Sequence, residues 1–219
     1  KSENQNQEFL NFFKDDKKDI KLLNYFCIDV LKNHLEPKKY PLPIFPKEFK
    51  FDSQVSGFVT WLDESSKDYR RRLRGCIGTF NSNEIEKLLR YFAVISSRED
   101  DRFKSVDISE LDNFSMSVSL LYGYESTKDI YDWELGVHGI QVMFTSKGKE
   151  YFACYLPEVP IIDNWDKRLT LDRCVKKSGY AEELGHLDEV SKNMEIVRFK
   201  SIKSSITYKQ YLEYKKIDN

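Results

Sequence analysis

A cysteine placed between two glycines is the feature of this sequence best suited to chemistry. Cys76 lies within residues 73–80, whose sequence is LRGCIGTF. In an extended strand, side chains two positions apart point to the same side, so we expect Arg74 to lie beside the thiol. A neighbouring guanidinium favours the thiolate, which is the reactive form of cysteine. Gly75 and Gly78 would let a ligand or another backbone approach closely, and the stretch therefore predicts a nucleophile.

The same stretch also fits a purely structural role. Free cysteine is among the residue types most often buried, where it behaves as a small apolar side chain. Gly75 and Gly78 would then mark a bulge or a tight crossing of two strands. The local pattern leaves both interpretations of Cys76 open.

Two further residues have chemistry that could assist a thiol. His138 ends the alternating apolar row that continues through residues 140–144, and an imidazole can accept the proton of a cysteine. Glu158 lies between Pro157 and Pro160, and a carboxylate on a rigid loop could orient such a base. The alternatives are a hydrogen-bonded structural histidine and an ordinary surface glutamate.

Composition excludes several classes of protein. The 219 residues carry a net charge of −1, so no overall positive field draws the chain to nucleic acid or to anionic membranes. Hydrophobic residues make up 40% of the chain, which is enough for a core. No run of about 18 apolar residues occurs, which predicts that the chain does not cross a membrane.

The cysteines and histidines predict neither disulfides nor a metal centre. Four cysteines occur without a C-x-x-C pair, which favours free thiols in the cytoplasm, with the nucleus as the alternative. Three histidines lie far apart, and the only metal site left open is a mixed one of Cys76, His138 and Glu158. No glycine-rich nucleotide motif is present, and no cofactor is predicted. Because the chain begins at Lys1 without methionine, we expect a fragment or a processed product.

Hydrophobic spacing predicts the elements that position these residues. Apolar residues recur every three or four positions after residue 16, after residue 84 and around Leu171, which predicts helices. Alternation predicts strands at 55–62, 114–120, 140–145 and 194–201, in addition to the strand that carries Cys76. Local signals add turns and caps: a hairpin turn at 146–148, a cap at Asp163 or Asn164 before a helix containing Trp165, and a capping box of Thr207 and Gln210.

The order of these elements predicts an α+β protein. Its sheet is mixed and mainly antiparallel, with helices flanking it. A polar N-terminal arm is expected at residues 1–14, followed by a single domain at 15–216.

Several segments together resemble one known family, over approximately residues 20–214. Residues 73–80 are similar to the signature octet of the AMMECR family, which holds the Alport-syndrome, midface-hypoplasia and elliptocytosis chromosomal-region protein and its microbial and fungal relatives. Residues 132–140 are similar to its second block, and residues 155–159 with Trp165 and Asp166 are similar to its third. Asp101-Arg102-Phe103 also matches.

This resemblance implies two lobes enclosing a cleft near the signature residues. Polar residues drawn from separate matched blocks are what a composite site needs. The predicted catalytic residues are Cys76, His138 and Glu158, and the predicted binding residues are Arg74, Gly75, Gly78, Thr79, Asp101, Arg102 and Tyr155. The family supplies no established reaction, and its members occur beside or fused to Memo-like domains, which suggests a protein partner.

Two functions of different kinds follow. The first is an enzyme in which Cys76 attacks a small anionic substrate, by acyl or amide transfer or by hydrolysis. The alternative is a non-catalytic module that binds a small ligand or a protein through the same residues. A third and weaker hypothesis is RNA binding through the basic run Arg70, Arg71, Arg72 and Arg74.

Overall fold

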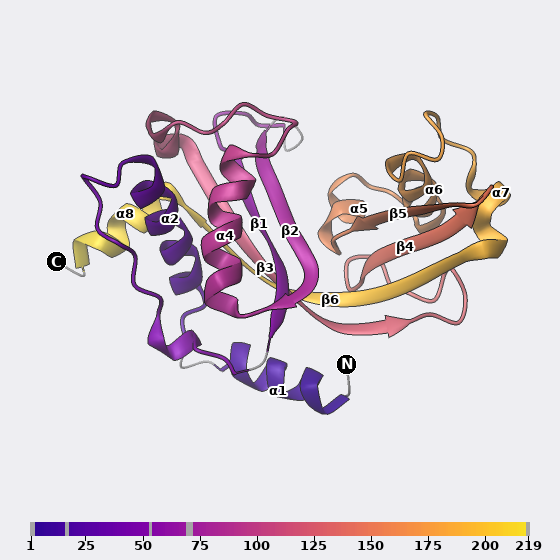
Figure 1. Ribbon diagram of the computed structural model, residues 1–219, viewed down its shortest axis with the longest axis horizontal. Helices are drawn as coiled ribbons and strands as arrows, with labels where there is room; N and C mark the ends of the chain where they lie inside the picture. Colours follow the sequence, from indigo (N-terminus) through magenta and orange to yellow (C-terminus); the bar gives the residue numbers. More distant parts are fainter. Residues whose placement is uncertain (1–2, 16–17, 53, 69–71, 218–219) are drawn as a thin grey trace. The chain divides into compact units, whose positions relative to one another are not determined.

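The computed structural model describes residues 3–15, 18–52, 54–68 and 72–217 (Figure 1). Its strands are β1 (Val55–Asp63), β2 (Leu73–Asn83), β3 (Phe114–Ser126), β4 (Gly139–Ser146), β5 (Lys149–Tyr155) and β6 (Met194–Thr207). Its α-helices are α1 (Glu3–Phe13), α2 (Lys21–Leu35), α4 (Ile85–Arg98), α5 (Glu158–Ile162), α6 (Lys167–Lys177), α7 (Leu187–Val190) and α8 (Tyr208–Ile217). Short 3₁₀ helices occupy Lys47–Phe49, Ile108–Asn113 and Ser191–Asn193.

The strands form one sheet in the order β2-β1-β3-β6-β4-β5. β1 is antiparallel to β2 and β3, and β4 is antiparallel to β5 and β6. The predicted α+β class with a mainly antiparallel sheet is therefore confirmed. The chain folds into two compact units, a larger one of Gln7–Leu121 with Ile202–Asn219 and a smaller one of Tyr122–Ser201 with the first residues up to Asn6. The long strands β3 and β6 each contribute to both units.

The larger unit is built from β1, β2 and the first part of β3 with α2 and α4. α4 packs on β1 and β2, and α2 packs against α4. The apolar faces of both helices are those predicted from their spacing, and they include the fully buried Leu23, Cys27 and Leu89. None of the helices in the described part of the chain is long and apolar enough to span a membrane.

The N-terminal segment predicted as a polar arm contains the helix α1. Phe9 and Phe13 are buried on it, and their rings contact Phe51 and Phe49 at centroid distances of 6.2 and 6.3 Å. Ring burial of this kind holds a short helix that would be marginal in isolation.

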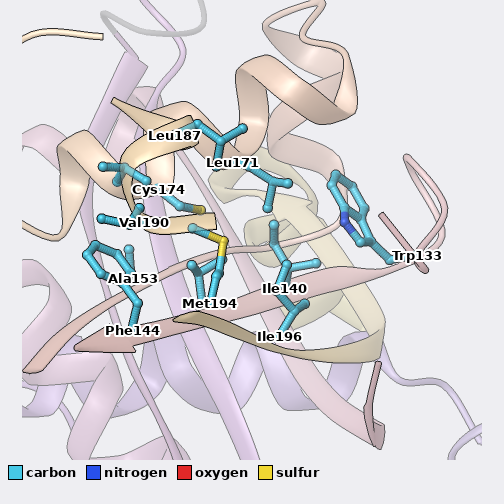
Figure 2. Close-up of a cluster of buried hydrophobic side chains, with 12 residues drawn as sticks. Trp133, Ile140, Phe144, Ala153, Leu171, Cys174, Leu187, Val190, Met194 and Ile196 are labelled. Atoms are coloured by element: carbon cyan, nitrogen blue, oxygen red, sulfur yellow. The ribbon is translucent and has the colours of Figure 1, made fainter. Parts of the chain in front are cut away.

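The smaller unit has its own core, in which α6 packs on β5 and α7 on β4 (Figure 2). Twelve buried side chains form it: Trp133, Ile140, Val142, Phe144, Ala153, Leu171, Cys174, Val175, Leu187, Val190, Met194 and Ile196. Burial raises the pKa of the Cys174 thiol, so this cysteine is an inert core residue.

Three of the predicted local features are a hairpin turn and two helix caps. Lys147 and Gly148 have positive φ angles of 51° and 76°, as the predicted hairpin turn between β4 and β5 requires. The cap predicted at Asp163 or Asn164 is wrong, because Asn164 has a φ of 53° and Asp166 caps α6 by accepting from Leu169 N at 2.7 Å. The capping box at Thr207 and Gln210 is confirmed, with bonds of 2.8 and 3.2 Å.

Gly75 sets the approach of α4 to β2. A Cβ atom built on Gly75 would lie 1.7 Å from the carbonyl oxygen of Ser96, in the last turn of α4. Trp61, which pairs with Gly75 across β1 and β2, donates from its indole nitrogen to Ser96 Oγ at 3.1 Å and to Ala93 O at 3.2 Å. The C-terminal turn of α4 therefore packs directly on the backbone of β2 at Gly75, and the Trp61 indole lies beside this contact.

We predict that Gly75→Ala destabilises the protein by more than about 3 kcal/mol, because backbone on both sides must move to admit the methyl group. Ser82→Ala, an exposed position on the same strand, is the control and should change stability by less than about 0.5 kcal/mol. Urea unfolding followed by circular dichroism measures both. Equal stability of the two variants would contradict the packing described for Gly75.

Candidate functional site

Cys76 lies in the middle of β2, opposite Thr60 of β1. The hydroxyl of Thr60 donates to the sulfur at an Oγ1–Sγ distance of 3.1 Å. Thr60 is buried and Cys76 is half-buried, so the sulfur is neither sealed in a core nor fully exposed. A hydroxyl that donates to sulfur stabilises the thiolate more than the thiol.

The backbone of Cys76 is held by two side chains from the segment that follows α4. Its N–H donates to Asp100 Oδ2 at 2.9 Å, and its carbonyl oxygen accepts from Arg102 Nη2 at 3.2 Å. Asp100 and Arg102 also bind each other, at 2.9 Å from Nε and 2.7 Å from Nη2. One carboxylate and one guanidinium therefore fix the strand backbone on both sides of the Cys76 Cα atom.

The electrostatics of this pair favour the charged forms. Burial acts to raise the pKa of Asp100, but hydrogen bonds from Arg102 and from Cys76 N–H outweigh it, and the net pKa is lowered. The hydrogen bond to Asp100 raises the pKa of Arg102, and the nearby Cys76 side chain adds a smaller contribution of the same sign. Arg102 is thus a permanent cation beside the thiol.

Arg102 has hydrogen-bond donors that no described residue accepts. Its side-chain hydrogen bonds come from Nε and Nη2, and Nη1 makes no hydrogen bond to the part of the chain that the structure describes. The side chain is 54% exposed, whereas that of Asp100 is 5% exposed. A guanidinium with one free NH₂ group can bind an anion from solution.

Arg74, predicted to bind substrate, is already paired. Its Nε and Nη2 donate to the two carboxylate oxygens of Glu110, both at 3.0 Å, and Nη1 donates to the carbonyl of Lys104. The bidentate pair compensates the charge of Arg74 within the protein. Arg102 is therefore better placed than Arg74 to bind an anionic group.

The other predicted residues of the larger unit have structural surroundings. Gly75 and Gly78 both permit a close backbone approach, since a Cβ on Gly78 would lie 2.2 Å from Gly57 O. Thr79 accepts a local bond from Asn81 N at 3.0 Å. Asp101 is exposed, and its neighbour Asp100 makes the contact with Cys76.

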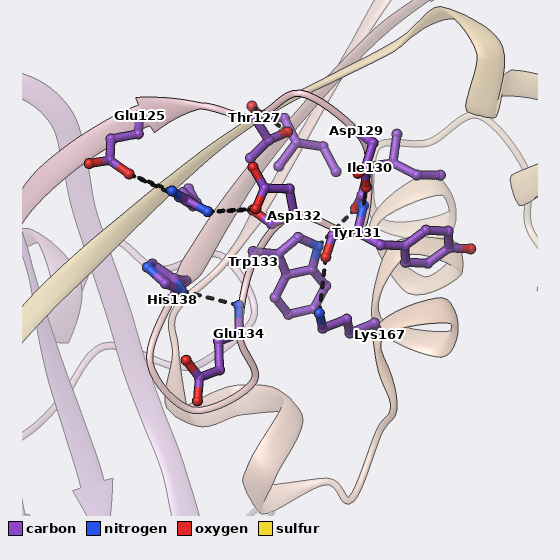
Figure 3. A network of polar contacts seen from close by, with 12 residues as sticks. Glu125, Thr127, Asp129, Ile130, Tyr131, Asp132, Trp133, Glu134, His138 and Lys167 are labelled. Carbon is purple, nitrogen blue, oxygen red and sulfur yellow. Dashed lines mark hydrogen bonds and ion pairs between the residues drawn. The ribbon is translucent and has the colours of Figure 1, made fainter.

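His138 lies in the smaller unit, in the turn that leads into β4 (Figure 3). Its N–H donates to the carbonyl of Glu134 at 2.9 Å, and its imidazole Nδ1 accepts from Glu134 N–H at 3.1 Å. Gly136, with a φ of 77°, closes the turn between them. Arg198 of β6 donates to Asp132 of the preceding loop and to Glu125 of β3.

These contacts define the protonation of His138. A neutral imidazole that accepts at Nδ1 must carry its proton on Nε2, so Nε2 is a donor. Burial, followed by the charges of Arg198 and Lys200, lowers the pKa of His138. The neutral form with a proton on Nε2 therefore prevails at neutral pH, and this form offers no acceptor at Nε2.

Tyr155 and Glu158 also belong to the smaller unit. The Tyr155 ring contacts Trp165 at a centroid distance of 5.3 Å, with Lys177 Nζ 4.4 Å from its centre. Burial raises the pKa of Tyr155 to about 12, so the phenol stays protonated. Glu158 is the first residue of α5 and is half-buried, a favourable position for a negative charge.

The structure thus brings Cys76 and Arg102 together and adds two residues that sequence reasoning missed. Thr60 was missed because the pairing register of β1 and β2 decides which residue faces Cys76. Asp100 stands beside the matched Asp101-Arg102-Phe103 segment, so its acidity was the available signal. His138, Tyr155 and Glu158 lie in the other unit, and their predicted roles stay predictions.

Two alternative classes of site gain nothing from the described residues. Among them, no three His, Cys, Asp or Glu side chains gather as a metal site. Arg70 and Arg71 of the basic run lie outside the described residues, whereas Arg72 and Arg74 are ion-paired with Glu64 and Glu110.

Comparisons with known proteins agree with the fold and with the residue pattern. The AMMECR1 family model matches residues 24–204. An uncharacterised protein of Schizosaccharomyces pombe is 32% identical over 188 residues, covering 86% of this chain and 93% of that protein. An uncharacterised protein of Arabidopsis thaliana is 33% identical over 193 residues, covering 87% of this chain and 86% of that protein.

A solved structure is similar as well. The crystal structure of an uncharacterised protein of Pyrococcus horikoshii matches with a TM-score of 0.69 at 22% identity, over 84% of this chain and 89% of that one. Fold and site together define an α+β protein with a polar cluster around a strand cysteine. The chain belongs to the AMMECR1 family, a family of unknown function.

We predict that Asp100→Asn destabilises the protein by about 2 kcal/mol, because it removes the charge that binds Arg102 and weakens the contact with Cys76 N–H. The folded-state pKa of Asp100 is lowered, so its contribution should be present above about pH 4 and lost as the pH falls through that lowered value. Denaturant unfolding of the wild type and the variant at several pH values measures this. Asp101→Asn is the control, and an equal loss there would refute the assignment.

We predict that His138 is neutral at pH 7 and protonated on Nε2. Two-dimensional ¹⁵N–¹H spectra of the imidazole should show a proton on Nε2 and a titration below about pH 6.5, with His138→Gln assigning the signal. Because the folded-state pKa is lowered, protonation should destabilise the smaller unit as the pH falls through that value. A proton on Nδ1 at neutral pH would contradict the turn geometry.

Proposed function

We propose that Cys76 is the nucleophile of a thiol-dependent enzyme that acts on a carbonyl group of a small anionic substrate. The observation that supports this most is the hydrogen bond from Thr60 Oγ1 to Cys76 Sγ, 3.1 Å long, at a sulfur that is only half-buried. Stabilised negative charge and access are the two properties that separate reactive cysteines from inert ones. Cys27 and Cys174 lack the second, because both are fully buried.

Arg102 supplies the anion-binding group in this proposal. Its cation lies close enough to influence Cys76 electrostatically, and its free Nη1 donors face no protein acceptor among the described residues. Asp100 fixes the guanidinium by a bidentate contact. A carboxylate of the substrate would bind Nη1 and so bring its carbonyl carbon towards the sulfur.

The chemistry balances as a two-step acyl transfer. The sulfur attacks the carbonyl carbon, a C–S bond forms, and the C–N or C–O bond to the leaving group breaks as that group takes a proton. Water or an amine then attacks the thioester, its proton returns to the sulfur, and the thiol is restored. Hydrolysis and transfer differ only in this second acceptor. The sequence predicted His138 as the proton acceptor and Glu158 as the orienting acid, but this step is written without them, because Nδ1 of His138 already accepts from Glu134 N–H.

A second candidate function is a binding module without chemistry. The contacts of Asp100 and Arg102 with the backbone of Cys76 favour it, because they hold the strand whether or not the thiol reacts. The function would then be to bind an anionic ligand at Arg102 Nη1, without any reaction at the thiol. Cys76→Ser distinguishes the two candidates, since a module tolerates the change in cells and an enzyme does not.

We predict that iodoacetamide labels Cys76 about tenfold faster than Cys154, the other half-buried cysteine, at pH 7. Thr60→Val should slow labelling of Cys76 severalfold because the donor to sulfur is lost, whereas Thr60→Ser keeps the hydroxyl and should retain the fast rate. Mass spectrometry of tryptic peptides measures each rate separately. Cys154 is an internal reference for folding in every variant.

Equal labelling of Cys76 and Cys154, or fast labelling of Cys76 in Thr60→Val, would overturn the catalytic proposal. Fast labelling with full tolerance of Cys76→Ser in cells would leave the binding module as the function.

A further inference from the structure

A cavity of about 650 Å³ lies in the larger unit, between α2, α8 and residues 40–48. Its size is that of a small-molecule site. Six aromatic side chains line it: Tyr25, Phe26, Tyr40, Phe45, Tyr211 and Tyr214. Cys76, Thr60, Asp100 and Arg102 do not belong to this lining.

The proline-rich wall of the cavity is held in place by side chains. Asn33 donates to the carbonyl of Tyr40 at 2.7 Å, and Arg90 donates to the carbonyl of Pro43 at 2.8 Å. Phe45 is buried with its ring 5.1 Å from that of Phe26. A wall that is fixed in advance binds a ligand with a smaller loss of conformational freedom.

Lys32 is the unusual residue of this lining. It is 8% exposed, it makes one hydrogen bond, to the Tyr211 hydroxyl at 3.2 Å, and it forms no ion pair with any described carboxylate. Its Nζ lies 4.3 Å from the centre of the Tyr40 ring. Burial lowers the pKa of Lys32, and the charge of Asp29 opposes that shift. An ammonium group with three donors is thus buried with a single acceptor.

Asp29, whose charge acts on Lys32, forms no direct ion pair with it. Asp29 accepts from Tyr211 Oη at 2.7 Å and from Lys215 Nζ at 2.8 Å, and it is connected to Lys32 only through the Tyr211 hydroxyl. The charged lining residues are Lys32, Lys47 and Lys215, which are positive, and Asp29 and Glu48, which are negative. The lining therefore carries one net positive charge, and Lys32 is its buried cation.

We propose that this cavity binds a small aromatic carboxylic acid, whose carboxylate pairs with Lys32 and whose ring packs among the tyrosines. Charge complementarity selects the acid, because a single anionic group would give Lys32 its missing counter-ion and acceptors. The rings and the exposed rim residues Leu42 (79%) and Ile44 (85%) select an apolar, planar body. The lining has no arginine, which disfavours a phosphate.

The test is an isothermal titration of the full chain with 3-phenylpropionate. Saturable binding is expected, with 3-phenylpropanamide, its neutral analogue, and inorganic phosphate each at least about tenfold weaker. Lys32→Met keeps the apolar stem and should weaken binding of the acid by a similar factor, without loss of stability. Lys209→Met, an exposed lysine of α8 outside the lining, is the matched control and should bind normally.

A second pair of variants tests the proposal even if the Lys32→Met variant does not fold. Leu42 is exposed at the rim, so Leu42→Asp and Leu42→Asn should both fold, and only the negative charge of the former should weaken binding further. No saturable binding up to about 10 mM, equal binding of the amide, equal binding of phosphate, or unchanged binding in a folded Lys32→Met variant would each overturn the proposal. Because neither Cys76 nor Arg102 takes part, these results are independent of the catalytic proposal.

Discussion

The approach of the α4 backbone to Gly75 is the contact on which the site around Cys76 depends. The last turn of the helix occupies the space of a side chain that glycine lacks, with Ser96 O 1.7 Å from the position of a Cβ atom. Asp100 follows the helix within two residues, so the same close approach delivers its carboxylate to the N–H of Cys76. The packing of α4 on β2 therefore also determines which charged groups surround the Cys76 thiol.

Three cations of the larger unit differ in how the fold compensates their charge. Arg74 is paired with Glu110, so the arginine closest in sequence to the thiol contributes structure. Arg102 is paired with Asp100 but keeps a free NH₂ group, and Lys32 is buried without a counter-ion among the described residues. Positive charge that the fold does not compensate is available to a ligand, because an anion there replaces interactions with water that burial has removed.

The smaller unit explains why a histidine in a motif need not be a base. His138 and Glu134 bind each other reciprocally across a tight turn, and Arg198 ties that turn to β6. The residues around it are structural as well, since Trp133 is buried and a Cβ on Gly139 would lie 2.4 Å from the ring of Phe199. Most residues of this segment therefore shape the loop, and the loop in turn orients the His138 imidazole, whose Nε2 is a hydrogen-bond donor.

Most features that depend on near neighbours along the chain could be predicted from the sequence, although the cap of α6 was placed at Asp163 or Asn164 instead of Asp166. The buried faces of α2 and α4, the alternating strands, the turn at Lys147 and Gly148 and the capping box at Thr207 arise from spacing and local dihedral preference, which a single chain displays. Tertiary structure alone decided which residues meet Cys76. The register of β1 against β2 brings Thr60 to the sulfur, and helix packing brings Asp100, not Asp101, to the backbone. Partners separated by 16 and 24 residues are chosen by the packing of whole elements, and no local pattern encodes that choice.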